Sequence, residues 1–315
     1  MIGGISMGIF SGWRKHRHEE KDQSTATTPL STSRTSGGPQ VQWTEEFEQS
    51  LYVVRTDQDG NAIVGGANGF AAKIDPAQNT LWSHRFLSAI RALAVDHQDN
   101  LLFGDISGDL SKLNRQLDTE WTNDLLNRYI VTMAADQLDN IIVGNVTGQS
   151  VQKVTKTGEL DWTTSFDAPI DTLACDGKGN TYVGSNGVVT KLDADGQEQW
   201  QQAVTGKLQN IVVNDAIWVA TSGVLFKFDF EGNQVWSTSV GGHNSLLAVG
   251  PSGDLYHVYQ TNDRQTAYER LAATTGDLVW ETTSDTSALP VSVSAGKQGV
   301  YVVFSNSTMQ RVSEK

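Results

Sequence analysis

The residues best suited to metal chemistry lie in short acidic stretches that share one spacing. Asp57, Asp59 and Asn61 alternate as in the first half of a calcium-binding loop, but the glycine at position six and the glutamate at position twelve do not follow. The same Asp-x-x-x-Asn spacing recurs at 96–100, 136–140 and 176–180. Asp and Asn also stabilise tight turns through local side-chain hydrogen bonds. We therefore expect repeated hairpin turns, and we predict no metal site and no cofactor.

Histidine and cysteine chemistry is sparse in this sequence. No nucleophile elbow, phosphate-binding loop or zinc motif is present. The single cysteine, Cys175, excludes an intrachain disulfide and a cysteine-based structural zinc site. Four histidines are scattered without metal-ligand spacing: His84, His97, His243 and His257. These observations favour a protein that is not an enzyme, and we predict no catalytic residues.

A tryptophan series organises most of the chain. Seven tryptophans recur at intervals of 36 to 44 residues: Trp43, Trp82, Trp121, Trp162, Trp200, Trp236 and Trp280. A basic series runs in phase with them, and each member is followed by an apolar residue: Lys73, Lys112, Lys153, Lys191, Lys227, Arg270 and Arg311. Together with the acidic turns, the two series define an internal repeat of about 40 residues.

Each repeat contains four short strand-like segments. In the unit 130–166, the segments 130–135, 141–144, 151–155 and 160–166 alternate with turns, as in one blade of a β-propeller. After Trp280 only three such segments remain, whereas residues 41–47 form a fourth strand with no blade before it. We predict an all-β, seven-bladed propeller of four-stranded antiparallel blades. Its N-terminal strand 41–47 completes the C-terminal blade and closes the ring.

Four of the repeats share the pattern Gly-x-x-x-Trp, at 158–162, 196–200, 232–236 and 276–280. They resemble the tryptophan-docking repeat of PQQ-type (quinoprotein-like) β-propellers, and the resemblance covers residues 41–315. It implies that each indole stacks on a glycine peptide of a neighbouring blade. Gln78 and Leu117 occupy the glycine position in two repeats. The quinone enzymes of this family have eight blades and a calcium ion, so seven blades resemble a non-catalytic scaffold branch.

One arginine departs from the repeat at the wall of the expected channel. Arg55 stands where the innermost strands of the other blades carry Ala, Val or Ser. A guanidinium at this place is either an anion contact or a salt-bridge partner within the ring. If an enzyme or a ligand-binding protein used this fold, it would act at the channel mouth near Arg55.

Further candidate binding residues lie on one rim. Aromatic and arginine side chains are common anchors of binding patches. The loops before the innermost strands contribute Arg91, Arg128 and Tyr129. The sixth blade is longer than the others, and this stretch is either an inert hairpin or a binding patch made of Tyr256, His257, Tyr259, Asp263 and Arg264. Such a rim suits a protein or a glycan ligand.

Composition divides the chain into residues 1–22, 23–40 and 41–315. The Ser/Thr/Gly/Pro-rich segment 23–40 is expected to be a flexible linker. Residues 1–22 are either disordered or a docking peptide with the contact residues Ile9, Phe10, Trp13, Arg14, Lys15 and Arg17. The net charge of −13 argues against a nucleic-acid partner. The sequence shows no secretory signal and no apolar run of about 20 residues that could span a membrane.

These features predict a non-catalytic recognition or scaffold module. Its N-terminal peptide would attach it to a larger assembly, such as a cell-surface structure or a virion, and one rim would bind a protein or a glycan. The alternative is a ligand-binding or quinone-dependent enzyme that acts at the channel mouth. The compartment stays open between the cytoplasm and a surface assembly.

Overall fold

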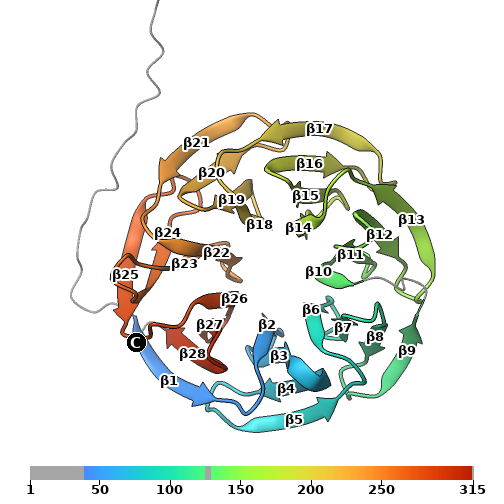
Figure 1. The fold of residues 1–315 in the computed structure, drawn as a ribbon, viewed down its shortest axis with the longest axis horizontal. Helices are drawn as coiled ribbons and strands as arrows, with labels where there is room; N and C mark the ends of the chain where they lie inside the picture. The colour runs from blue at the N-terminus through green and yellow to red at the C-terminus, as the bar shows by residue number, and fades with distance from the viewer. Residues whose placement is uncertain (1–38, 125–128, 314–315) are drawn as a thin grey trace, which may run out of the picture.

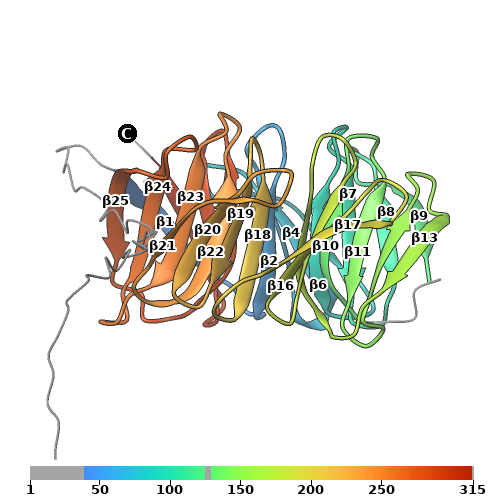
Figure 2. The same cartoon turned by 90° about the horizontal axis from the view of Figure 1, so that it is seen from above.

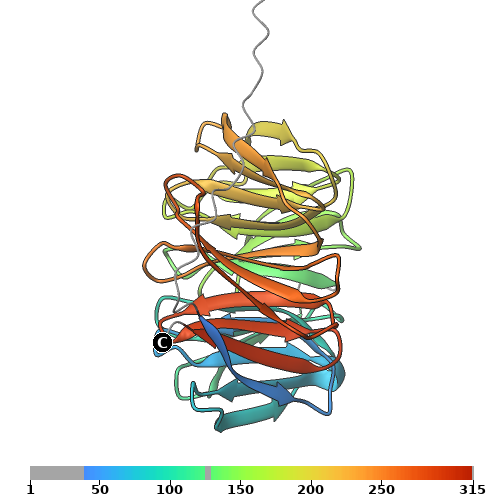
Figure 3. The ribbon, with the colours of Figure 1, turned by 90° about the vertical axis from the view of Figure 1, so that its left-hand side faces the viewer.

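The computed structural model describes residues 39–124 and 129–313. Seven four-stranded antiparallel sheets surround a central channel (Figure 1). Seen edge-on, the ring is a disc, and its strands run between the two flat faces (Figures 2 and 3). The prediction of an all-β propeller with seven four-stranded blades is therefore confirmed.

Each blade is numbered here from its innermost to its outermost strand. Blades 1 to 3 contain β2 (Leu51–Thr56), β3 (Ala62–Gly66), β4 (Phe70–Ile74), β5 (Thr80–Arg85); β6 (Ile90–Val95), β7 (Leu101–Asp105), β8 (Leu110–Leu113), β9 (Thr119–Asn123); and β10 (Ile130–Ala135), β11 (Ile141–Asn145), β12 (Ser150–Val154), β13 (Leu160–Ser165). A short 3-10 turn, η1 (Ala67–Gly69), lies between β3 and β4.

The remaining blades have the same order. Blades 4 to 6 contain β14 (Ile170–Cys175), β15 (Thr181–Ser185), β16 (Val188–Leu192), β17 (Glu198–Ala203); β18 (Leu208–Val213), β19 (Ile217–Thr221), β20 (Val224–Phe228), β21 (Gln234–Ser239); and β22 (His243–Val249), β23 (Leu255–Gln260), β24 (Thr266–Leu271), β25 (Leu278–Ser284). Blade 7 contains β26 (Pro290–Gly296), β27 (Gly299–Phe304), β28 (Thr308–Ser313) and β1 (Gln40–Glu46).

Blade 7 joins the two ends of the chain. Strand β1 is the outermost strand of this blade and pairs antiparallel with β28, from Gln40 opposite Ser313 to Glu46 opposite Thr308. The predicted closing strand is thus confirmed, with bounds one residue earlier than expected. Because β1 occupies the edge of β28, the ring is closed by a strand from the other end of the sequence.

Apolar strands buried on both faces hold the blades together. Strand β7 is buried along its whole length, and so are its counterparts β3, β11, β15 and β19. Between blades 1 and 2, Ile63 packs in one cluster with Ile90, Leu93 and Phe103. Such continuous apolar runs differ from the alternating pattern of a half-exposed sheet because both faces of each second strand are covered.

The tryptophans fasten each blade to the next. Trp162 donates through Nε1 to the carbonyl oxygen of Ala194 at 2.9 Å, in the turn between the third and fourth strands of blade 4. A Cβ atom on Gly196, in that same turn, would lie 2.7 Å from the Trp162 ring. Glycine is required there because the indole lies against its backbone. The stacking implied by the family resemblance is therefore confirmed at this junction, and it recurs for Trp121 on Gly158, Trp200 on Gly232 and Trp236 on Gly276.

The two repeats without this glycine keep the same turn. Gln78 and Leu117 both adopt left-handed backbone conformations, with φ of 71° and 72°. Trp43 still donates to the carbonyl oxygen of Pro76 in the first of these turns, at 3.0 Å. In the second, Leu117 packs in one cluster with Trp82. The turn conformation is thus preserved at a local steric cost that glycine would avoid.

The basic series strengthens the same junctions. Lys153 lies opposite Trp162 across β12 and β13, and its Nζ donates to the same Ala194 carbonyl oxygen at 3.2 Å. Lys153 also lies 3.6 Å from Asp161, and Lys73 and Lys112 pair with Asp57 and Asp96 at 2.7 and 3.1 Å. The members of this series therefore contact acidic side chains or carbonyl groups within the ring, as expected for long cationic side chains that lie along a strand.

The loops divide between the two faces of the disc. The turn between the second and third strands hydrogen-bonds to the loop before the innermost strand, as in Ile106 N to Ala89 O at 3.1 Å. We call this side the loop face; its loops are 47–50, 86–89, 166–169, 204–207, 240–242 and 285–289. The opposite side is the turn face; its turns between first and second strands are 57–61, 96–100, 136–140, 176–180, 214–216, 250–254 and 297–298.

Candidate binding site at the central channel

The channel wall carries one arginine at a level where the other six blades carry small residues. Arg55 lies opposite Ile63 of β3, and the same register position in the other blades is occupied by Ala94, Ala134, Ala174, Val212, Ala248 and Ser294. Arg55 lines a channel cavity of about 440 Å³ and a smaller cavity of about 140 Å³ toward the loop face. The predicted place of Arg55 at the channel wall therefore agrees with the structure.

Arg55 is not held by an acid. Its Nη1 donates to the carbonyl oxygen of Val54 at 2.8 Å. Over residues 39–124 and 129–313, no Asp or Glu oxygen lies within 4 Å of its guanidinium nitrogens. Burial lowers the pKa of Arg55 to about 10, so the group is cationic at neutral pH. The sequence left two interpretations of Arg55 open, an anion contact and a salt bridge within the ring. Within the described residues, the salt bridge is not formed.

The mouth of the channel on the loop face contains a cation–π pair. The guanidinium carbon of Arg91 lies 3.8 Å from the ring centre of Tyr52, which comes from the neighbouring blade. Both residues line the smaller cavity together with Asp171 from blade 4. Burial raises the pKa of Asp171, although the charge of nearby Lys207 acts in the opposite direction. The mouth is therefore cationic and aromatic on one side and acidic on the other.

Exposed apolar side chains lie on the loop face of the blades that carry the cationic side of this mouth and of the blade beside them. Leu87 is fully exposed in the loop before β6, and Ile106 lies in the adjoining turn of the same blade. Leu289 and Val291 are exposed at the start of β26 in blade 7. Blades 7, 1 and 2 are consecutive around the ring (Figure 1). We call the set Tyr52, Leu87, Arg91, Ile106, Leu289 and Val291 the mouth patch.

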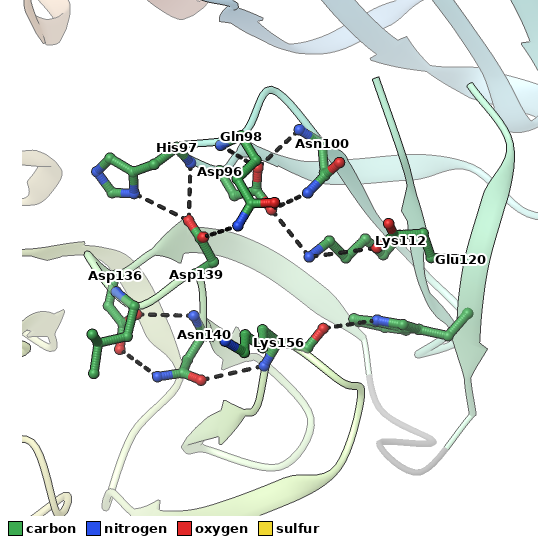
Figure 4. Close-up of polar contacts among 12 residues, drawn as sticks. Asp96, His97, Gln98, Asn100, Lys112, Glu120, Asp136, Asp139, Asn140 and Lys156 are labelled. Atoms are coloured by element: carbon green, nitrogen blue, oxygen red, sulfur yellow. Dashed lines mark hydrogen bonds and ion pairs between the residues drawn. The ribbon is translucent and has the colours of Figure 1, made fainter. Parts of the chain in front are cut away.

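The acidic turns on the turn face are internally satisfied. Oδ1 of Asp96 accepts the backbone N–H groups of Gln98 and Asn100 at 2.9 and 2.8 Å, and Oδ2 accepts Nδ2 of Asn100 at 2.7 Å (Figure 4). The turns that begin at Asp57, Asp136 and Asp176 use the same bonds. The prediction of repeated turns is confirmed, because these oxygens bind amides of their own turn.

Neighbouring turns are also linked to one another. Asp139 accepts the backbone N–H of His97 at 3.0 Å and the side-chain amide of Gln98 at 2.9 Å, which joins blades 2 and 3 (Figure 4). Burial would raise the pKa of Asp139, but these hydrogen bonds outweigh it and lower the pKa. Among the residues that the structure describes, no three His, Cys, Asp or Glu side chains gather as a metal site. The predicted absence of metal and cofactor stays a prediction.

The sixth blade contains a buried polar network instead of an exposed patch. His257 is fully buried, and its Nε2 and Nδ1 lie 2.7 Å from Ser245 Oγ and 2.8 Å from Glu269 Oε2. The hydroxyl of Tyr259 donates to the other oxygen of Glu269 at 3.1 Å. Burial and the Glu269 charge raise the pKa of Tyr259. His257 and Tyr259 therefore connect strands of the blade and do not form the rim surface that the sequence suggested.

The other candidate residues are dispersed. Tyr256 packs against Trp280, with ring centres 6.0 Å apart. Asp263 and Arg264 are exposed in the turn between β23 and β24, on the loop face. Tyr129 is half-buried before β10. Arg128 lies outside the described residues, as do the predicted docking residues Ile9, Phe10, Trp13, Arg14, Lys15 and Arg17.

Sequence reasoning missed most of the mouth patch. Tyr52 was not singled out because its contact with Arg91 crosses between blades. Leu87 carried a usable signal, since it is a large apolar residue in a loop between two strands. Within the described part of the chain, no helix is long and apolar enough to cross a membrane.

Comparison with protein families gives one match. The model described as outer membrane protein assembly factor BamB matches residues 117–243 and 185–315, which together span well over half of the chain. No curated protein matches the sequence.

Solved structures share the architecture at low sequence identity. Selenomethionine-substituted virginiamycin B lyase from Staphylococcus aureus has a TM-score of 0.74 and 9% identity, over 88% of this chain and 100% of that chain. A catalytically inactive form of that lyase with quinupristin has the same TM-score and coverage at 8% identity. At such identities the likeness shows the fold alone.

Proposed function

The chain belongs to the repeat family of the outer membrane protein assembly factor BamB, and on this premise we propose that it is a non-catalytic recognition module. It binds a partner protein through the loop face, at the mouth patch. An assembly role is named for the family member in the description of the matching model. For this chain the proposal depends on the residues exposed on the loop face.

The mouth patch is the observation that carries this proposal. Leu87, Ile106 and Val291 are exposed on the loop face, where the guanidinium of Arg91 lies over the ring of Tyr52. Exposed apolar side chains that gather beside polar groups are typical of protein-binding surfaces, and Arg and Tyr are frequent anchors in them. The loop face offers no free strand edge with which a partner strand could pair, because the ring is closed. Binding would therefore use side chains presented by rigid strands and short loops.

The place of β1 favours display of this face. Gln40 pairs with Ser313, the last described residue of β28, so β1 begins at the outer edge of the ring on the turn face. The chain before Gln40 therefore joins the disc on the side opposite the mouth patch. An attachment through residues 1–22 would leave the loop face open to a partner, as in a head displayed on a cell-surface structure or a virion.

The test compares matched substitutions on the two faces. The double variant Leu87→Asp/Ile106→Asp changes the mouth patch, and Leu138→Asp changes an exposed leucine of the turn face. Co-purification from source extract, with quantitative mass spectrometry, should show partners that the double variant loses and that Leu138→Asp retains. Equal retention by both variants would exclude the mouth patch as the binding surface.

An enzyme is the second candidate, and one observation favours it. Ser245, His257 and Glu269 follow the order nucleophile, base and orienting acid at hydrogen-bond distances. However, Ser245 is only 3% exposed, and its backbone N–H is bonded to Gln209 of the neighbouring blade. We therefore expect an alkyl fluorophosphonate to leave the intact mass of the protein unchanged. A covalent adduct on Ser245 that disappears in His257→Gln would support the enzyme instead.

A further inference from the structure

The channel contains a cation whose hydrogen-bonding capacity is mostly unused. A guanidinium has five N–H donors in a planar fork. For Arg55 one bond is formed, to the carbonyl oxygen of its neighbour Val54. The six small residues at the same level leave open space around it, within the cavity of about 440 Å³. A half-buried, unpaired cation in such a cavity gains more from an anion than one in bulk water.

Three polar side chains that line the smaller cavity with the arginine each accept a hydrogen bond from the backbone. The hydroxyl oxygen of Ser292 accepts the backbone N–H of Val54 at 3.2 Å, and that of Thr172 accepts the N–H of Ile211 at 3.3 Å. The amide oxygen of Asn210 accepts the N–H of Leu247 at 2.7 Å. The backbone thus occupies one acceptor site of each oxygen, and two O–H groups and one NH₂ group remain as donors beside the channel. All three residues line the smaller cavity with Arg55.

We propose that the central channel binds a carboxylate, which Arg55 holds through its guanidinium fork. Ser292, Thr172 and Asn210 donate hydrogen bonds to the side of the carboxylate that faces away from Arg55. Planar, two-point contact with a carboxylate is the geometry for which arginine is best suited. Arg55, Thr172 and Asn210 also line the larger cavity, whose volume of about 440 Å³ is that of a small-molecule site. Asp171 is the acidic residue that lines the smaller cavity with Arg55, and it lies in blade 4, across the channel from blade 1.

The carboxylate has two possible sources, which share this chemistry. It is either a free organic acid or an acidic side chain on a loop of the partner that covers the loop face. The second source rests on the proposed function, and the first does not. Both require the same residue, Arg55, and both enter by the mouth between Tyr52, Arg91 and Asp171.

Calorimetric titration of the full chain tests the free acid. The probes are succinate and its neutral counterpart succinamide. Arg55→Ala places in blade 1 the residue that most other blades carry, so the variant is expected to fold. Lys178→Gln is the control, because it removes one positive charge from an exposed turn of the turn face. We expect succinate to bind the unmodified chain and the control equally, and Arg55→Ala at least about tenfold more weakly. Succinamide should not bind.

Partner binding by the same variants tests the other source. If succinate does not bind, Arg55→Ala should capture the loop-face partner at least about tenfold more weakly than Lys178→Gln does, which identifies the carboxylate as the partner's. Succinate binding that is equal in Arg55→Ala overturns the proposal. So does the absence of succinate binding combined with unchanged partner capture. Loss of capture by Leu87→Asp/Ile106→Asp reports on the loop face separately, so the two proposals fail independently.

Discussion

The two ends of the channel use charged residues in opposite ways. On the turn face, Asp57, Asp96, Asp136 and Asp176 each bind the amides of their own turn, and Asp139 also joins one blade to the next. On the loop face and in the channel below it, Arg55 lacks an acidic partner among the described residues, and Leu87 and Ile106 are exposed. The aspartates of the turn face hold the fold together, whereas Arg55 in the channel keeps donors available for a ligand.

This difference indicates which charges stabilise the ring and which are free to bind. Buried hydrogen-bonded carboxylates are expensive to remove because they leave several donors unsatisfied. Unpaired or exposed groups contribute little to stability, so they are available for binding. Substitutions on the turn face should therefore change stability, and those on the loop face should change binding.

The largest expected effect comes from opening the ring. A chain that begins at residue 48 lacks β1, including Trp43 and its bond to Pro76. It should unfold or associate, because the edge of β28 is then unpaired. Light scattering and thermal unfolding, compared with a chain that begins at residue 39, give the measurement. If the shorter chain stays a monomer of equal stability, β1 does not close the ring, and the arrangement of the two faces would not depend on it.

The next effect compares one aspartate on each face. Asp96→Ala removes the bonds to Gln98 and Asn100 and the ion pair with Lys112, whose side chain is only 5% exposed. It should lower the free energy of unfolding by about 3–5 kcal/mol. Asp109→Ala on the loop face should change it by less than about 0.5 kcal/mol. Urea unfolding of the two variants provides the comparison, and equal losses would contradict it.

The pH dependence of stability should also distinguish carboxylates of the two faces. Hydrogen bonds that outweigh burial lower the pKa of Asp57 and Asp176, so their stabilisation is complete above the ordinary value of 3.8 and is lost as the pH falls through the lower folded values. Burial, aided by Asp105 and Asp124, raises the pKa of Asp109. The contribution of Asp109 to the free energy of unfolding is complete below pH 3.8 and is lost as the pH rises through the pKa of the folded state.

Urea unfolding between pH 7 and pH 3 measures this profile. Stability should rise modestly toward the ordinary carboxyl value and then fall below it. Asp109→Asn should flatten the rise, and Asp57→Asn should reduce the fall. A profile that both substitutions leave unchanged would show that these carboxylates do not govern the pH dependence.

The smallest expected effect is at Leu87. Leu87→Ser removes a fully exposed side chain and should change the free energy of unfolding by less than about 0.5 kcal/mol. In the same blade, Leu93→Ala empties a fully buried position and should cost about 2–5 kcal/mol. Thermal or urea unfolding distinguishes the two. A large loss in Leu87→Ser would mean that this leucine serves the fold and not a partner.

The repeat made the fold predictable, because Trp, Lys and the acidic turns recur for the same structural reason in every blade. The docking of Trp43 on the turn that contains Gln78 was less predictable, since a left-handed glutamine replaces the expected glycine. Arg55 was found as an exception to the repeat. His257 was misplaced on the rim, because Ser245 and Glu269 are distant in sequence and only strand pairing brings them to it.

Site-specific photo-crosslinking tests the central claim most directly. A benzoylphenylalanine placed at position 87 reports on the loop face, and the same residue at position 138 reports on the turn face; both positions carry exposed leucines. Irradiation in source extract should give one discrete crosslinked species from position 87 and none from position 138. A crosslink from position 138 alone would contradict the account and assign recognition to the turn face.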